Sequence, residues 1–287
     1  MASNLRAIRR KIKAVGNIWQ ITRAMQMVST SRLKKAQPRV EASREYLRRL
    51  SEITASVAGN VPADLHPYLQ HRPIVAQGLI VVAGDKGLAG SHNANILRAA
   101  EEYIAAQNTP VKVTTVGVRA GEYGQRRGWN IVHRLDSPND STQSREALEI
   151  ARLARRMFDD GEIDVLRVAY TQFFSVLRRP PTITQLLPIV GDGDDSEGTA
   201  EYIFSPPAEN LLGALLPRTV DAQIVNMLLQ SIAAEHAARM TAMTAATENA
   251  DELRGTLSRQ LNRARQAQIT TELLEVIAGA DALAQGD

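Results

Sequence analysis

The residues best placed to do chemistry stand in a glycine-rich turn, Gly84 to Gly90 (GDKGLAG), between a buried-strand pattern and a helix pattern. In a sheet of alternating strands and helices, such a turn is where helix N-terminal amides hold phosphate. These glycines read G-x-x-G-x-x-G, which matches neither the dinucleotide fingerprint nor the Walker A pattern. The sequence therefore favours a tight turn that lets helix and strand pack closely, and it predicts no cofactor.

Metal and nucleophile chemistry find no support in the remaining candidates. The chain has no cysteine, which excludes disulfides, thiol catalysis and thiolate-bound metals. No two histidines share a helix at i,i+4 spacing, and no acid cluster supports them. Three nearby aspartates lack the calcium-loop pattern and are interpreted as a solvated loop. The histidines are His66, His71, His92, His133 and His236, and the aspartates are Asp192, Asp194 and Asp195. We expect no metal and no catalytic residue.

Positive charge is concentrated at one end of the chain. The first 50 residues contain 13 Lys or Arg against only Glu41 and Glu45, although the whole chain has a net charge of only +3. A solvated helix face and contact with an acidic protein surface both fit this run. Nucleic acid fits the charge but not the aromatic content of 4%, so we expect none as a partner. Arg-rich, acid-free residues 1–40 also imitate a presequence, but the helical pattern continues beyond them, which favours mature protein.

Two long amphipathic segments at the chain ends must position any functional side chains. In residues 1–60, apolar residues alternate in steps of three and four, with slips that predict an irregular supercoil and with Pro38 predicting a kink. Residues 207–287 carry a similar seam without proline after Pro217. We expect an antiparallel coiled coil, with a helix bundle as the alternative. The expected seam residues include Ile21, Val28, Met240, Met243, Leu257 and Leu261.

The middle of the chain, residues 73–205, alternates strand and helix patterns. The order β-α-β-α-β-α-β predicts a parallel sheet with flanking helices, a small doubly wound, Rossmann-like α/β domain. Two late strands are expected at Thr182 to Ile189 and at Glu201 to Phe204. No run approaches 18 apolar residues, so we expect no membrane-spanning segment. The predicted fold class is therefore α/β, with the long coiled coil of the terminal helices added to that domain.

Motifs at both ends and in the centre resemble one family. Residues 8–35 (IRRKIKAVGNIWQITRAMQMVSTSRLKK) resemble the opening helix of the ATP synthase gamma subunit family, with its I-x-x-I-T-[KR]-A-M-x-M-V core. Residues 235–243 (EHAARMTAM) and 262–280 (NRARQAQITTELLEVIAGA) resemble that family's C-terminal helix. Residues 84–95 (GDKGLAGSHNAN) resemble its first strand–helix turn. The resemblance covers essentially the whole chain.

The resemblance implies the central shaft of a rotary proton-driven ATP synthase, without a catalytic site of its own. Its implied partners are a ring of three α and three β subunits, the ε subunit and the membrane c-ring. Membrane association would come only through the complex, peripherally, at the cytoplasmic face of the bacterial plasma membrane. Residue by residue, it implies contacts with the β catch loops at Met25, Arg265, Gln266 and Thr270. It also implies a foot facing the c-ring at Tyr202, Phe204 and Ser205.

Overall fold

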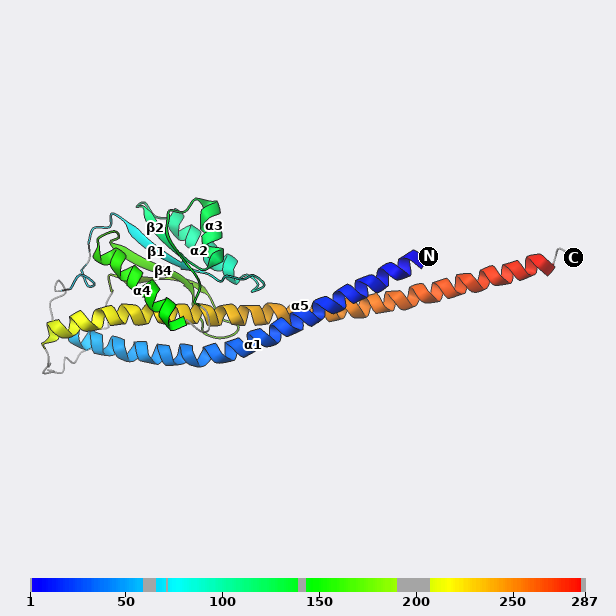
Figure 1. Ribbon diagram of the computed structural model, residues 1–287, viewed down its shortest axis with the longest axis horizontal. Helices are drawn as coiled ribbons and strands as arrows, with labels where there is room; N and C mark the ends of the chain where they lie inside the picture. The colour runs from blue at the N-terminus through cyan, green and yellow to red at the C-terminus, as the bar shows by residue number, and fades with distance from the viewer. Residues whose placement is uncertain (1, 59–65, 71, 139–142, 190–206, 285–287) are drawn as a thin grey trace. The chain divides into compact units, whose positions relative to one another are not determined.

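The computed structural model describes residues 2–58, 66–70, 72–138, 143–189 and 207–284. The chain divides into two compact units, one formed by Met1–Val28 with Met240–Asp287 and the other by Ser29–Arg239. Two long helices, α1 (Ala2–Ala58) and α5 (Ala208–Ala284), each contribute to both units (Figure 1). In the described part of the chain, no helix combines the length and hydropathy that a membrane crossing requires.

Both long helices contain a proline. Pro38 lies inside α1 and Pro217 lies inside α5, and neither one ends its helix. A proline removes one backbone donor and crowds the preceding turn, so the neighbouring turns must hold each helix together. The end of α1 at Ala58 agrees with the stop signal that Gly59 and Asn60 give in the sequence.

The second unit contains a five-stranded sheet whose strand order is β3-β2-β1-β4-β5. Its strands are β1 (Gln77–Val82), β2 (Val111–Val116), β3 (Ile131–Leu135), β4 (Val165–Thr171) and β5 (Pro181–Leu187). The first four are parallel to one another, and β5 runs antiparallel to β4. The helices between the strands are α2 (His92–Ala105), α3 (Val118–Arg127) and α4 (Gln143–Asp159). The expected α/β class is confirmed, and the expected strand at 201–204 lies outside the described residues.

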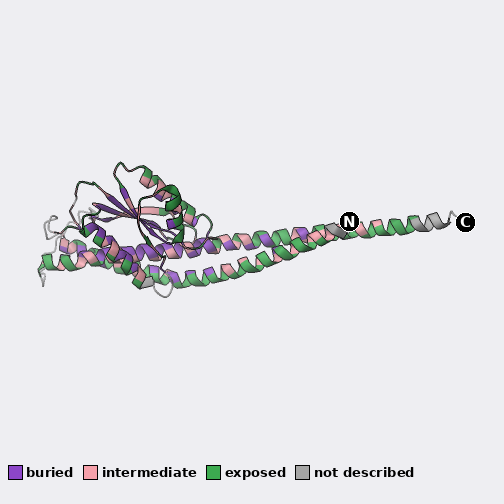
Figure 2. Ribbon diagram, turned by 45° about the horizontal axis from the view of Figure 1, so that its top comes forward, coloured by how far each residue is buried: buried purple, intermediate pink, exposed green. Residues whose placement is uncertain are grey.

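Alternating residues of β1 build the two faces of the sheet. Leu79 and Val81 pack with α2 and α3, whereas Ile80 and Val82 pack with α4 and α5. In Figure 2 the strands of the sheet are coloured mainly as buried or intermediate, and every residue of β1 is buried. Because successive strand residues point to opposite faces, a run of apolar residues is needed where both faces are covered. This explains the continuous QGLIVV pattern of β1.

The portions of α1 and α5 in the second unit pack antiparallel. The hydroxyl oxygens of Thr54 and Thr219 lie 3.1 Å apart, and Asn226 Nδ2 donates to Ser43 Oγ at 3.2 Å. The buried positions of α1 there are Ser29, Leu33, Ala36, Val40, Leu50, Thr54 and Val57. Half-buried Ser43 and Leu47 fill the interval between Val40 and Leu50 and so keep steps of three and four along the buried positions. The expected five-residue slip between Val28 and Leu33 is wrong, because buried Ser29 holds the position that the apolar pattern had assigned to Val28.

Candidate functional site

The first unit is held by a small seam between α1 and α5. Val15, Ala250 and Leu257 are buried together, with Ile12 and Trp19 packed against them. The guanidinium of Arg254 also lies over the ring of Trp19, 5.6 Å from its centroid, a distance at which a cation and an aromatic face attract. The seam is therefore short in apolar contacts for helices of this length.

Hydroxyl groups continue this seam. Thr247 Oγ1 lies 2.9 Å from Thr22 Oγ1 and 2.7 Å from the carbonyl oxygen of Met243. Thr22 Oγ1 also donates to the carbonyl oxygen of Trp19 at 3.1 Å. Thr22 follows Val15 by one heptad, so it faces α5 although it is polar. The heptad spacing could have revealed this position from the sequence, but a search for apolar residues passes over it.

Two of the expected seam residues do not lie in the seam. Ile21 is 60% exposed and Val28 is 53% exposed. Each precedes a seam position by one residue, which turns its side chain about 100° away around the helix. On α5, Met243 and Leu257 are buried, while Met240 and Leu261 are half-buried.

The displaced residues form a second apolar face on α1. Ile18, Ile21 and Val28 are exposed, and Met25 between them is half-buried. Steps of three, four and three place these four residues on one side of the helix. A face of this kind on a helix that already has a partner marks a surface for another protein.

The C-terminal part of α5 has apolar side chains over nearly half of its circumference, and Thr271, Glu272 and Glu275 lie on the other side. The apolar side chains that face solvent are Ile269, Leu273, Leu274, Val276 and Ile277. Counting outward from the Thr22–Thr247 pair, the start of α1 at Ala2 is level with about residue 267 of α5. Residues beyond that level have no described α1 residue opposite them. A broad apolar face on a helix normally packs against a partner, so this face is suited to contact with another protein.

The four residues expected at the β catch loops do not come together. Arg265, Gln266 and Thr270 are exposed on α5, where Thr270 Oγ1 donates to the carbonyl oxygen of Gln266 at 3.0 Å. Met25 lies beyond Thr22, toward α5 residues that precede Thr247. Arg265 is 18 residues after Thr247, which corresponds to about 27 Å along the helix. A single contact point cannot include both. Tyr202, Phe204 and Ser205 lie outside the described residues.

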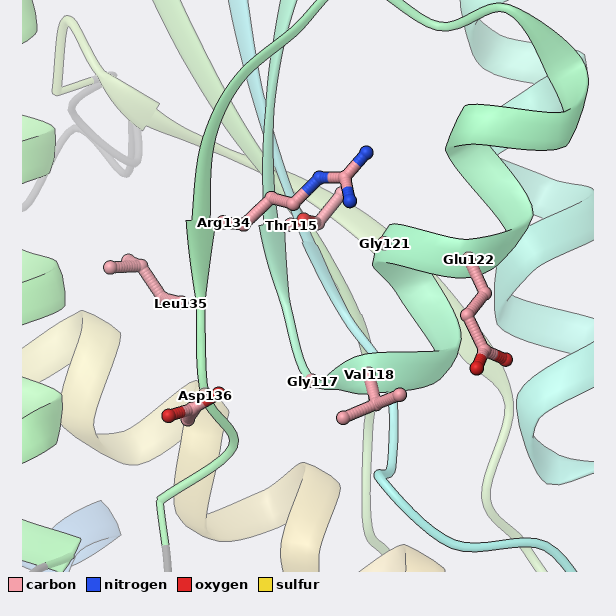
Figure 3. Close-up of a pocket in the computed structure, with 8 residues that line it drawn as sticks. All are labelled: Thr115, Gly117, Val118, Gly121, Glu122, Arg134, Leu135 and Asp136. Carbon is pink, nitrogen blue, oxygen red and sulfur yellow. The ribbon is translucent and has the colours of Figure 1, made fainter.

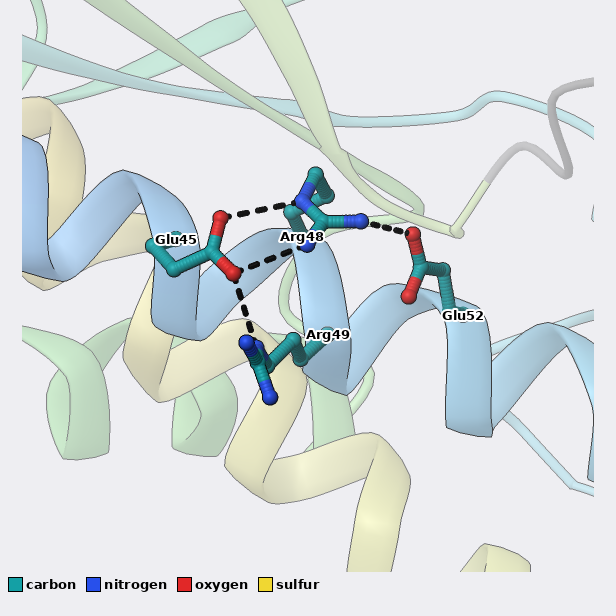
Figure 4. A network of polar contacts seen from close by, with 4 residues as sticks. All are labelled: Glu45, Arg48, Arg49 and Glu52. Carbon is teal, nitrogen blue, oxygen red and sulfur yellow. Dashed lines mark hydrogen bonds and ion pairs between the residues drawn. The ribbon is translucent and has the colours of Figure 1, made fainter.

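Basic side chains are exposed along the start of α1. Arg6, Arg9, Arg10, Lys11 and Lys13 all face solvent, and no acidic residue precedes Glu41 in the chain. Farther along, α1 does contain compensated charge: Glu45 accepts hydrogen bonds from Arg48 and Arg49, and Arg48 also donates to Glu52 (Figure 4). The hydrogen bonds from Arg48 and Arg49 lower the pKa of Glu45 to about 2. Because the N-terminal cluster contains basic residues and no acidic ones, it is the part of α1 suited to contact an acidic protein surface.

The glycine-rich turn after β1 is filled by the protein itself. Gly84 N donates to Asn93 Oδ1 at 2.9 Å, and Val118 N donates to Asp85 Oδ1 at 3.0 Å. A Cβ on Gly84 would lie 2.7 Å from Cδ of Glu235, so this glycine permits close packing on α5. These contacts favour the packing interpretation of the turn over phosphate binding.

Beside this turn, a surface pocket of about 220 Å³ lies at the carboxyl ends of β2 and β3. Figure 3 shows Arg134, Glu122 and Asp136 at separate parts of its wall. Among the described residues no group of three His, Cys, Asp or Glu side chains could hold a metal ion. The pocket therefore offers no convergent set of groups for a reaction.

Comparison with known proteins gives concordant matches. A family model described as ATP synthase matches residues 4–283. The ATP synthase gamma chain of Desulfitobacterium hafniense is 40% identical over 98% of this chain and 99% of its own length. That of Moorella thermoacetica is 37% identical over the same shares.

Solved structures show the same fold at lower identity. A chain in the Euglena gracilis mitochondrial ATP synthase, solved as OSCP, F1 and c-ring, matches with a TM-score of 0.72 and 17% identity, covering 100% of this chain and 96% of that one. A chain from the rotor of the same synthase matches with a TM-score of 0.69 and 16% identity, covering 94% and 100%.

Proposed function

This chain belongs to the ATP synthase gamma chain family, and from that premise we propose that it is the rotating central-stalk subunit of a proton-driven ATP synthase. It couples proton flow through a membrane c-ring to ATP synthesis or hydrolysis in a ring of three α and three β subunits. It carries no catalytic site of its own and regulates ATPase activity through its rotational position. It associates with the membrane only through the complex, at the cytoplasmic face of the bacterial plasma membrane.

The observation that carries this proposal is the bare apolar end of α5. Leu274 and Val276 are 61% and 71% exposed, and no described α1 residue lies opposite them. A helix end with this broad apolar face fits an apolar surface that surrounding subunits provide. Such a sleeve, without specific polar contacts, also permits the helix to turn inside it, which a rotor requires.

Closer to the sheet domain along the chain, polar and apolar surfaces of the coil supply contacts that differ with the rotational angle of the subunit. A rotor changes the nucleotide affinity of a catalytic site only if it contacts that site's subunit differently at each angle. The exposed face of Ile18, Ile21 and Val28 and the basic cluster at the start of α1 are both one-sided. A one-sided surface meets each β subunit in turn as the coil rotates.

The residue roles implied by the family are divided between two levels of the coil. We assign Arg265, Gln266 and Thr270 to the β catch loops, where exposed guanidinium and amide groups can form charge-assisted hydrogen bonds. Met25, which is level with about residue 244 of α5, contacts a different part of the ring, about 30 Å away along the helix. Tyr202, Phe204 and Ser205 are assigned to the foot that faces the c-ring, and the ε subunit binds the lower part of the stalk.

Assembly with the catalytic ring tests the proposal. The chain is co-expressed with the α and β subunits of the same organism, and the expected product is an ATPase with one copy of the chain per three copies of each. Because the chain has no cysteine, a single Leu274→Cys reports on the end of α5. Its thiol should react freely in the isolated chain and be protected in the complex.

The matched control is Val75→Cys, a 73% exposed position just before β1, which should react equally in both states. Failure of the chain to join the ring, or a Leu274→Cys thiol that reacts as fast in the complex as alone, would contradict the proposal.

A further inference from the structure

A buried histidine without hydrogen-bond partners stands at the start of α2. His92 is the first residue of this helix, directly after the glycine-rich turn, and its side chain is only 6% exposed. Neither ring nitrogen has a partner within the described residues. A buried polar group without a partner costs free energy, so its retention at this position calls for an explanation.

The charged groups around His92 come from three elements and are mostly positive. Arg239 and His236 of α5 and Arg179 from the connection between β4 and β5 all disfavour a charge on the ring. The turn of His92 itself carries Asp85 and Lys86, but Asp85 accepts the hydrogen bond from Val118 N. On α5, Glu235 pairs with Arg239. Within the described residues, the side chains that act electrostatically on the His92 ring are Arg239, Arg179 and His236, and none of them is a carboxylate that could compensate a charged ring.

The same residues fasten the turn to α5. Arg239 donates from Nε to the carbonyl oxygen of Gly87 at 3.4 Å. The carboxylate of Glu235 lies against Gly84, where a Cβ would have no room. The glycine-rich turn, the start of α2 and α5 therefore meet around His92. A change in the charge of this ring acts directly on their contact.

The pKa of His92 is lowered to about 4. Burial is the largest cause, and the charge of Arg239 is the next. The ring is therefore neutral in the closed contact at pH 7. In an opened contact, its pKa returns toward the ordinary value of about 6.5. Since the opened state then binds more protons, acid favours opening, and the stability of the contact is lost as the pH falls from about 6.5 to about 4.

We propose that the contact between the glycine-rich turn and α5 is an acid-released latch, which is closed while His92 is neutral and opens when its ring gains a proton. The latch goes beyond the proposed function, because it is a property of the chain alone and does not require assembly. It would release the glycine-rich turn from α5 in acid, while the core that the sheet, α4 and α5 share stays folded.

Thiol labelling of the full chain tests the latch, because the natural chain has no cysteine. Ala89→Cys places a reporter in the turn at a position that is 3% exposed, and Ala154→Cys places one in the core of α4. Each reacts with 4,4′-dithiodipyridine, and its rate is divided by the rate of the urea-unfolded chain at the same pH. The normalised rate of Ala89→Cys should rise about 20- to 30-fold from pH 7.5 to pH 5, with little change for Ala154→Cys.

A second substitution identifies the responsible group. His92→Phe in the Ala89→Cys background should abolish the rise, whereas the matched control His133→Gln, on β3, should keep it. A flat profile with His92 present, or an equal rise after His92→Phe, would overturn the proposal. If His92→Phe does not fold, the ring of His92 is titrated by NMR in the unsubstituted chain. Titration near pH 6.5 in the folded state would overturn it, and titration below pH 5 together with shifts of the turn amides would support it.

Discussion

Within the single helix α5, Leu216 and Leu228 of the 29–239 unit are buried, whereas Leu273 and Leu274 of the other unit face solvent. The buried pair belongs to a core that α4, α5 and the sheet build together. Among the described residues of the terminal unit, the buried apolar cluster consists of Val15, Ala250 and Leu257. The central unit thus has a large internal apolar core, while the terminal unit has a small one and presents a broad apolar face to solvent.

The largest expected effect separates the two kinds of leucine. Leu216→Ala should lower the free energy of unfolding by about 2–5 kcal/mol, because it opens a cavity in a packed core. Leu274→Ala should change it by less than about 0.5 kcal/mol, because its side chain is already in water. Urea unfolding of both variants of the isolated chain measures this. Equal losses would break the distinction between the units.

The next effect appears only in the complex. Leu274→Gln combined with Val276→Gln should lower ATP turnover of the assembled enzyme about fivefold or more, equivalent to roughly 1 kcal/mol, because polar groups then enter an apolar sleeve. The melting temperature of the isolated chain should stay unchanged. Steady-state ATPase assays at equal complex concentration provide the measurement. Unchanged turnover would show that no apolar partner surrounds this end.

A smaller effect is expected from the polar contact of the same helix. Arg265→Ala combined with Gln266→Ala should reduce coupled ATP synthesis or multisite hydrolysis, because charge-assisted bonds to a catch loop are lost. Both residues are exposed, so the isolated chain should lose less than about 0.5 kcal/mol of stability. The same assays after confirmed assembly decide the matter, and normal coupled turnover would rule out the contact.

The hydroxyl pair of the terminal seam should show coupling rather than a large loss. Thr22→Val and Thr247→Val should each cost up to about 1 kcal/mol, because each removes one partner of a contact at 2.9 Å. The double variant should cost less than the sum, since no hydroxyl is then left behind. A double-mutant cycle measured by chemical unfolding gives the interaction energy. Strict additivity would mean that the two hydroxyls do not interact.

The smallest effect concerns the ion pairs of Glu45. Its lowered pKa of about 2 means that the stability it contributes is present above the ordinary value of 4.5 and is lost as the pH falls toward 2. Because these side chains are exposed, Glu45→Gln should shift the melting temperature at pH 7 by less than about 1 °C. Calorimetry at pH 7 and pH 3 measures the shift. A drop of several degrees would show that the surface network matters more than the core.

Much of the fold could be predicted from the sequence because the sheet is buried on both faces. The pattern VKVTTV defines β2 from Val111 to Val116, and the stop signal after Ala58 defines the end of α1. The antiparallel pairing of the terminal helices followed from their length and periodicity. These features depend on local apolar pattern, which the sequence displays directly.

The surfaces were harder to predict because their residues break that pattern. Ile21 and Val28 looked like seam residues, but half-buried Thr22 and buried Ser29 occupy the positions that face α5. Hydrogen bonding across the helices makes a polar seam possible, and apolar periodicity alone does not reveal it. His92 carried no motif of its own, since its role depends on residues such as Arg239 that lie far away in the sequence. Long-range placement of this kind comes only from the folded chain.

Rotation of the chain inside the catalytic ring is the most direct test of the central claim. A single cysteine, Val75→Cys, carries a bead or gold rod, and the α and β subunits of the assembled complex are fixed to a surface. When ATP is added, we expect the probe to turn in one direction and in discrete steps, at a rate that follows ATP turnover. A probe that stays at a fixed angle while the same complexes hydrolyse ATP at full rate would contradict the account.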